Sequence, residues 1–248
     1  MVALFSPADS QTVEAVNMVT SHRAISLEPP NAERTLIVVG CGRGGTSLVA
    51  GAAIILGVPM GADSDSVNHE DVELVNAAQG RDVHGRPTSP VADSVTENLR
   101  RLIQERNDSN SLWGWKDPSA DLYLEKVSTE VRNPLVVFVN RDMAAIAQSE
   151  FNKMQYSIEQ AYEQALHRFS RYWSLLQKLQ WPTLLVSYER AALDPEALLC
   201  EMADFIGLDQ PTKQQREAVK RFAATRDYQA IPQSSTILEA PIIRSETA

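Results

Sequence analysis

The sequence predicts an α/β fold in which helices cover both faces of a mostly parallel sheet, giving three layers. Short apolar runs alternate with helical patterns along the chain, an order that is typical of parallel sheets. The first run, Leu36 to Val39, leads through a glycine-rich turn into an apolar helix. Glycines let backbone N–H groups approach an anion, and a helix N-terminus adds partial positive charge. We therefore expect a three-layer domain of the P-loop type, organised around this turn.

The bulk composition is that of one globular domain. A length of 248 residues is enough for a single α/β domain with a full core. The composition, 44% hydrophobic and 22% charged, is ordinary for a globular protein. A net charge of −9 argues against nucleic-acid binding. The two cysteines, Cys41 and Cys200, give no metal-ligand spacing, and we predict no metal site. The N-terminus lacks a signal-peptide pattern, and the longest apolar run, Leu48 to Met60, is too short to span a bilayer. We expect a cytoplasmic protein without a membrane span.

Residues 1–34 are expected to form an N-terminal arm or linker, and residues 35–248 the domain. The arm is polar and ends in a proline-rich stretch, with one short helix expected around Thr12 to Val19. Beyond the first helix, two polar loops are expected, Ala62 to Asn68 and Gly80 to Pro90. The second is rich in turn residues and is a candidate mobile flap or substrate loop. Neither loop carries a pattern that names a substrate.

The remaining elements follow from hydrophobic periodicity and helix-end signals. Strands are expected near Trp113 to Trp115, Leu135 to Val139 and Thr183 to Val186, and helices over His69 to Ala78, Val91 to Arg106, Ala144 to Asn152, Ser157 to Leu179 and Pro211 to Ala224. A further helix should begin at Asp194-Pro195 and end at Gly207. The buried stripe of the longest helix is expected to comprise Ala161, Ala165, Phe169, Trp173 and Leu176.

Several polar residues come directly after predicted strands. They are the glycine loop, Lys116, Arg141 and Tyr188. Ligands of open α/β sheets bind at the carboxyl ends of the strands, so we expect these residues to gather at one edge of the sheet.

The glycine loop fits three templates. Gly40 to Gly45 is a literal G-x-G-x-x-G dinucleotide fingerprint, and the same residues followed by Thr46-Ser47 form a nucleotide-phosphate loop in which Thr46 replaces the lysine. The third template is Gly-x-x-Arg-x-Gly-Thr-Ser, with the cation, Arg43, inside the loop. A dehydrogenase needs a second strand that ends in an acid about 20 residues further on, and no apolar run precedes the acids there. A kinase needs a phosphate-loop lysine, which this chain lacks. Its magnesium-binding acid would have to be Asp142, which directly follows the cation Arg141.

The third template resembles the phosphosulfate-binding loop of the sulfotransferases, and three further stretches resemble the same family. FVNRD at Phe138 to Asp142, followed by Ser149, is similar to the family's 3′-phosphate motif. WGWKDP, which ends at Pro118, resembles the W-K-D-P stretch of bacterial carbohydrate-type sulfotransferases and the K-D-P of tyrosylprotein sulfotransferases. VSYE, which ends at Glu189, followed by Asp194-Pro195 and then FIGL, matches the family's "V-x-Y-E, P, helix, F-I/L-G" ending.

This chain also departs from the family's pattern. Gly42 and Met143 stand where proline is common, Gly44 where serine is common, and Ser119 where an arginine often follows Lys-Asp-Pro. The C-terminal R-K-G motif of the cytosolic small-molecule enzymes is absent. These departures leave the acceptor subfamily open.

The resemblance implies transfer of a sulfuryl group from 3′-phosphoadenosine 5′-phosphosulfate (PAPS) to a hydroxyl or amine of a saccharide, glycolipid or small metabolite. The product would be 3′-phosphoadenosine 5′-phosphate (PAP), and no metal is required. The residues that it implies for the donor are Gly42, Arg43, Gly44, Gly45, Thr46 and Ser47 at the 5′-phosphosulfate, Arg141 and Ser149 at the 3′-phosphate, and Tyr188 at the adenine.

The catalytic residues that the resemblance implies are Arg43, Lys116 and Glu70. Arg43 would stabilise charge on the leaving oxygen, Lys116 would contact the sulfuryl oxygens, and Glu70 would act as general base, with His69 in reserve. Simpler interpretations stand beside these roles. Arg43 could only neutralise phosphate, Glu70 could favour a helix start, and Lys116 could pair with Asp117 at a turn. The chain could also be a P-loop nucleotide kinase or a non-catalytic nucleotide-binding protein.

Overall fold

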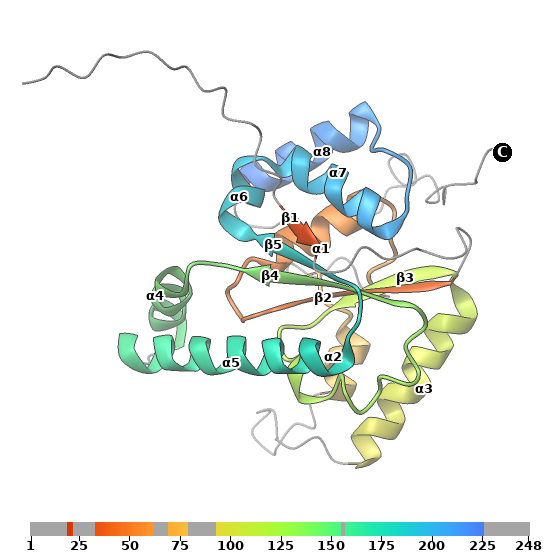
Figure 1. Ribbon diagram of the computed structural model, residues 1–248, viewed down its shortest axis with the longest axis horizontal. Helices are drawn as coiled ribbons and strands as arrows, with labels where there is room; N and C mark the ends of the chain where they lie inside the picture. The colour runs from red at the N-terminus through yellow and green to blue at the C-terminus, as the bar shows by residue number, and fades with distance from the viewer. Residues whose placement is uncertain (1–18, 22–32, 62–68, 79–92, 155–156, 226–248) are drawn as a thin grey trace, which may run out of the picture.

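The computed structural model describes residues 19–21, 33–61, 69–78, 93–154 and 157–225 (Figure 1). The loops Ala62 to Asn68 and Gly80 to Pro90 lie outside these residues, as does the helix expected around Thr12 to Val19, apart from its last residue. Val19 begins a strand instead.

The described strands form one sheet in the order β1-β5-β4-β2-β3. They are β1 (Val19–Ser21), β2 (Arg34–Gly40), β3 (Leu112–Lys116), β4 (Pro134–Asn140) and β5 (Thr183–Ser187). Strands β2 to β5 run parallel, with Leu36 of β2 opposite Leu135 of β4. Only β1 is antiparallel among the described strands, and it pairs with β5 so that Val19 lies opposite Val186. The predicted, mostly parallel sheet is confirmed.

Helices cover both faces of this sheet, which confirms the predicted three layers (Figure 1). On one face lie α1 (Thr46–Ile55), α6 (Tyr188–Leu193), α7 (Pro195–Ile206) and α8 (Lys213–Ala224). On the other lie α2 (Val72–Ala78), α3 (Asp93–Ser109), the short 3₁₀ helix η1 (Ala120–Leu122) and α5 (Ile158–Leu179), and α4 (Met143–Met154) packs on α5.

Successive side chains of β2 point to opposite faces of the sheet, so this strand contributes to the hydrophobic core on both sides. Leu36 and Val38 pack with α1, α7 and α8, whereas Ile37 and Val39 pack with α2, α3 and α5. All seven residues of β2 are buried, as expected for a central parallel strand. This buried strand holds the glycine loop at its carboxyl end.

One part of the predicted core is wrong. Trp173, expected in the buried stripe of α5, is 40% exposed, and Tyr172 is fully buried in its place. Helical spacing puts residue 172 on the same face as Ala161 and Ala165, while residue 173 lies on the shoulder of that face. The Tyr172 hydroxyl also gains a partner there, since it donates to the backbone oxygen of Asp117 at 3.2 Å.

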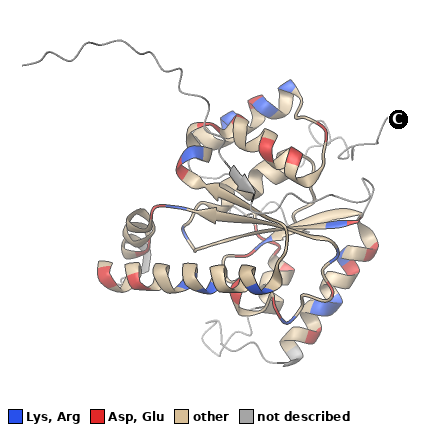
Figure 2. Cartoon of the chain, viewed as in Figure 1, with Lys and Arg blue, Asp and Glu red and all other residues tan. Residues whose placement is uncertain are grey.

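Within the parallel strands β2 to β5, charged residues occur only at strand ends, so this part of the sheet is almost uncharged (Figure 2). Arg34 begins β2, and its guanidinium donates to the backbone oxygen of Ile206. Lys116 ends β3, where it is only 3% exposed. A buried cation at the carboxyl edge of the sheet needs an anionic partner.

Candidate functional site

The glycine loop lies where the chain connections of the sheet diverge. β2 has β3 on one side and β4 on the other, and the chain leaves β2 through residues 41–45 to enter α1. In open α/β sheets such a switch point is where ligands bind. Lys116 is the last residue of β3, and Arg141 and Tyr188 follow the ends of β4 and β5, so the structure brings them to the same edge, as the sequence predicted.

The loop leaves the N-terminus of α1 open. Its N-cap is Gly45, which has no side chain to bond the first N–H groups, and the first turn carries no acidic residue. Gly44 donates its N–H to the Cys41 carbonyl at 2.9 Å, which closes a tight turn. Arg43 has a positive φ of 63° and an exposed side chain. The loop therefore presents backbone N–H groups and a cation at a helix N-terminus, a combination that suits an anion.

Gly45 is required here for two reasons, and Gly45→Ala should unfold more easily. Its φ of 85° disfavours any other residue, and a Cβ would lie 2.0 Å from Cδ2 of the Tyr188 ring. Left-handed strain and overpacking each cost about 1–3 kcal/mol, so we expect a loss of about 3 kcal/mol in the free energy of unfolding. Urea denaturation measures it, with Ser174→Ala on the exposed side of α5 as control. A loss below about 0.5 kcal/mol would contradict this account.

Arg43, Ser149, Arg141 and Tyr188 form one connected cluster. Nε of Arg43 donates to Oγ of Ser149 at 2.9 Å, and Nη1 of Arg141 donates to the Arg43 carbonyl at 2.7 Å. The Arg141 guanidinium lies 4.8 Å from the centre of the Tyr188 ring, a cation–π contact. Residues from three separate stretches of sequence thus meet around Arg43. The sequence predicted these residues, and the structure adds the contacts between them.

Lys116 meets the start of α1 and Glu70. Its Nζ lies 2.8 Å from Oε1 of Glu70 and 3.4 Å from Oγ of Ser47. Burial lowers the pKa of Lys116, Glu70 and Asp117 raise it, and the charge of Arg43 lowers it again, with a lower pKa as the net result. Asp117, in contrast, accepts the N–H of Ser119 at 2.7 Å. The lysine therefore forms an ion pair with Glu70, and the charge of Asp117 also acts on it.

The two predicted base candidates differ in their surroundings. His69 is 1% exposed, and its ring packs edge-on against Phe222 of α8 with 5.3 Å between ring centres. Glu70 is 24% exposed and reaches the lysine that touches Ser47. Glu70 is thus linked through Lys116 to the first turn of α1.

Sequence analysis missed Arg168 and Glu150. Arg168 of α5 lies against the loop, because a Cβ on Gly42 would be 2.9 Å from its Nη1 and 3.6 Å from Oε1 of Glu150. A signal existed, since position 168 falls on the arc of α5 that carries Ala161, Ala165 and Tyr172. A charged side chain on the buried face of a helix indicates a partner or a functional role.

Comparisons with known proteins bear on the fold. No protein-family model matches the sequence, and no curated protein matches it. Among solved structures, the sulfotransferase domain of the Synechococcus PCC 7002 olefin synthase is similar with a TM-score of 0.50 and 13% identity, over 84% of this chain and 80% of that one. The chain has a sulfotransferase fold.

Two mycobacterial structures were also matched. Sulfotransferase STF9 from Mycobacterium avium gives a TM-score of 0.49 at 15% identity, over 82% of this chain and 69% of that chain. Sulfotransferase STF1 from Mycobacterium tuberculosis H37Rv gives a TM-score of 0.45 at 17% identity, over 79% and 73%. At identities this low, activity has to be argued from the residues of the site.

Asp117, next to Lys116, makes stability depend on pH. Burial raises the pKa of its carboxyl from 3.8 to about 6. Between about pH 4 and pH 6 the Asp117 carboxyl holds a proton in the folded state and releases it in the unfolded state. The contribution of Asp117 to the free energy of unfolding therefore falls as pH rises from about 4 to about 6. Asp117→Asn keeps an acceptor for Ser119 and removes the titration. We expect its stability advantage over the wild type to grow across that interval by on the order of 3 kcal/mol. Denaturation from pH 4 to 7 measures it, and a pH-independent difference would contradict it.

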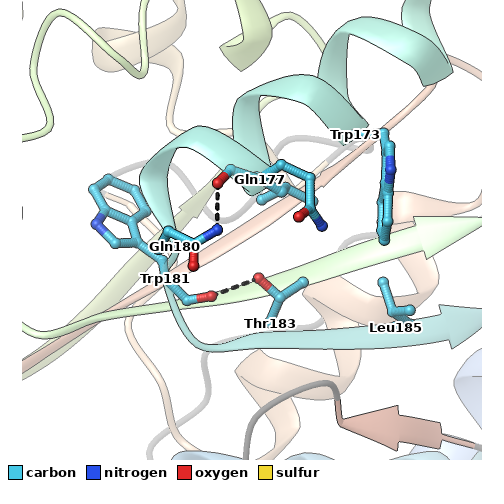
Figure 3. Close-up of a pocket in the computed structure, with 7 residues that line it drawn as sticks. Trp173, Gln177, Gln180, Trp181, Thr183 and Leu185 are labelled. Carbon is cyan, nitrogen blue, oxygen red and sulfur yellow. Dashed lines mark hydrogen bonds between the residues drawn. The ribbon is translucent and has the colours of Figure 1, made fainter.

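A pocket of about 180 Å³ lies away from the loop, between the C-terminal end of α5 and β5 (Figure 3). Trp173 and Trp181 stand at its two ends, with Gln177 between them (Figure 3). It is also lined by Thr183, the first residue of β5, so it lies toward the end of that strand opposite the glycine loop. The exposure of Trp173 thus belongs to this pocket and not to the candidate site.

None of the described helices is long and apolar enough to cross a bilayer. Within the same residues, no group of three or more His, Cys, Asp or Glu side chains is arranged to hold a metal ion.

Proposed function

We propose that this chain is a sulfotransferase that moves a sulfuryl group from PAPS to a hydroxyl or amine of a saccharide, glycolipid or small metabolite. One observation carries the proposal. The two sets of predicted residues, Arg43 with Ser149 and Lys116 with Glu70, meet the same glycine loop and the start of α1. In a chain with a net charge of −9, this gathering of cations on an open helix N-terminus favours an anionic ligand.

The loop and its neighbours fit the donor. The N–H groups of Gly42, Gly44 and Gly45, with the hydroxyls of Thr46 and Ser47, would hold the 5′-phosphosulfate. Arg141 and Ser149 would hold the 3′-phosphate, and Tyr188, which already stacks with Arg141, would pack beside the adenine. The fit rests on the uncapped N-terminus of α1 and on side chains that reach the loop or the start of α1 from β3, from the turn after β4 and from α4.

The chain's residues then have distinct tasks in an in-line transfer. A bond forms between sulfur and the acceptor oxygen while the bond between sulfur and the 5′-phosphate oxygen breaks, and PAP leaves. Glu70 takes the proton of the acceptor hydroxyl. Arg43 stabilises the charge that develops on the leaving oxygen, which helps the transition state more than the ground state.

The ion pair between Lys116 and Glu70 couples two of these tasks. While Lys116 holds Glu70 at 2.8 Å, one oxygen of the carboxylate is occupied by the ion pair. A sulfuryl group beside Ser47 would attract Lys116, which already lies 3.4 Å from the Ser47 hydroxyl. Glu70 would then be released to accept the proton once the donor is bound.

A second candidate function is a nucleotide kinase. The observation that favours it is Lys116, because it brings to the first turn of α1 the ammonium that Thr46 fails to supply within the loop. A kinase would bind ADP with magnesium, whereas a sulfotransferase would bind PAP without it. A non-catalytic nucleotide-binding protein would bind PAP and transfer nothing.

Calorimetric titration with PAP, beside ADP with magnesium and NAD, tests the proposal. We expect PAP to bind tightly and to raise the melting temperature, since it binds only the folded state, with weak or no response to the other two. A transfer assay with labelled PAPS and a panel of hydroxylated acceptors then separates an enzyme from a binding protein. Preference for ADP with magnesium, or for NAD, would overturn the proposal.

We also propose a cytoplasmic location. Cys41 and Cys200 are both free thiols, which suits a reducing compartment. Cell fractionation tests this, and recovery of the chain outside the cytoplasm would refute it.

A further inference from the structure

Arg168 reaches the glycine loop from a helix that the resemblance did not involve. Residue 42 has no side chain, and the guanidinium fills that space, with Nη1 2.9 Å from where a Cβ would stand. The Arg168 side chain is half-buried. The helix that carries it is well anchored, since Tyr172 one turn later is fully buried and bonds the backbone of Asp117. A cation is therefore held against the loop by a rigid element.

Glu150 shares this position with Arg168. Its Oε1 would lie 3.6 Å from the same Cβ, so the carboxylate and the guanidinium face one point of the loop. Glu150 follows Ser149, whose hydroxyl bonds Arg43 at 2.9 Å. Burial raises the pKa of the Glu150 carboxyl, and the positive charges of Arg168 and Arg43 act against that shift. A carboxylate thus sits among the cations of an anion site.

We propose that Arg168 is a further phosphate-binding residue of the donor site, and that Glu150 acts in the free protein as the counter-anion that the 3′-phosphate displaces. This inference rests on the proposed function and adds to it a third cation beside Arg141 and Arg43. Arg168 and Glu150 both face Gly42, and the next residue, Arg43, bonds Ser149, so we assign to Arg168 the 3′-phosphate that Ser149 would hold. A side chain at residue 42 would displace the guanidinium from this place.

A purely structural role for the pair makes different predictions. If Arg168 only supported the loop, its loss would weaken every nucleotide that the loop holds. If it binds the 3′-phosphate, its loss would weaken PAP but not adenosine 5′-monophosphate, which lacks that group. Neutralising Glu150 separates the two roles further. If Glu150 only supports Arg168, its neutralisation would loosen the loop. If Glu150 competes with the phosphate for Arg168, its neutralisation would tighten PAP binding.

The experiment compares Arg168→Gln, Arg168→Lys and Glu150→Gln with the full-length wild type by calorimetric titration with PAP and with adenosine 5′-monophosphate. Lys178→Gln serves as matched control, because it removes the same charge from α5 at an exposed surface pair with Glu125. We expect Arg168→Gln to weaken PAP binding about 10- to 100-fold, the value of a hydrogen bond to a charged group, and to leave the monophosphate unchanged. Arg168→Lys should recover part of the loss, and Glu150→Gln should strengthen PAP binding several-fold.

Two results would overturn the inference while the proposed function stands. One is PAP binding by Arg168→Gln equal to that of a wild type that binds PAP tightly. The other is an equal loss for PAP and the monophosphate with no gain in Glu150→Gln, which would make the pair structural. A wild type that binds no PAP would refute both the inference and the proposed function. Melting curves identify a variant that fails to fold, in which case Arg168→Lys and Glu150→Gln decide.

Discussion

Glu70→Gln is expected to lower kcat by about 10²- to 10⁴-fold, the usual contribution of a general base, with little change in PAP affinity. Glutamine keeps an oxygen at the position that accepts from Lys116 at 2.8 Å, so the lysine retains a partner. The substitution therefore removes proton acceptance and leaves the local packing in place. Steady-state transfer rates and PAP titration, measured on the same preparation, give the two quantities.

The matched control is Glu73→Gln, which removes a carboxylate of α2 from an exposed ion pair with Arg106. Its kcat should equal that of the wild type within about twofold, because exposed ion pairs contribute little. If Glu70→Gln kept its kcat, Glu70 would be only the counter-ion of Lys116, and the base would have to be sought elsewhere. A loss of PAP affinity in Glu70→Gln with unchanged kcat would also contradict the assigned role.

The features that the sequence predicted correctly rest on local chemistry. Asp194 caps α7 by accepting the N–H of Ala197 at 3.0 Å, and Gly207 ends that helix in the left-handed conformation with φ 82°. Such signals act over a few residues and can be read directly. The same holds for the apolar runs that became β2 and β4, because burial on both faces demands continuous β-branched and aliphatic residues. The position of the loop followed from β2, and that of Lys116 from the strand expected near Trp113 to Trp115.

The features that were missed depend on contacts between distant elements. The strand β1 has three residues and gains its place by pairing with β5, more than a hundred positions away, which no local pattern reveals. Arg168 of α5 lies against Gly42, and a periodic stripe does not say what a helix packs against. Trp173 was misplaced because apolar character was taken as burial, although large apolar residues also line surface pockets. The site was therefore predicted as a set of residues and not as a set of contacts.

Arg43→Ala and Arg141→Ala are expected to act in opposite ways. Arg43→Ala should lower kcat by about 10²- to 10³-fold, the cost of one donor that stabilises transition-state charge, and change PAP affinity by less than about threefold. Arg141→Ala should weaken PAP binding about 10- to 100-fold, as for a lost bond to a charged phosphate, with kcat at saturation nearly unchanged. Single-turnover rates at saturating PAPS, together with PAP titration, separate the two effects.

The role expected of Arg43 requires its side chain to change partners when the donor binds. Nε of Arg43 bonds the Ser149 hydroxyl at 2.9 Å, and Ser149 is the residue assigned to the 3′-phosphate. For Arg43 to reach the leaving oxygen, its side chain must exchange this contact when the donor binds, which its exposed position permits. Arg43→Lys is the variant that decides, because it keeps the charge and loses the Nε donor. If Arg43→Lys retains most of kcat while Arg43→Ala does not, charge at the leaving oxygen is the function of this residue. If Arg43→Ala instead weakens PAP binding as Arg141→Ala does and spares kcat, Arg43 belongs to the 3′-phosphate with Ser149, and Lys116 would then be the cation that stabilises the transfer.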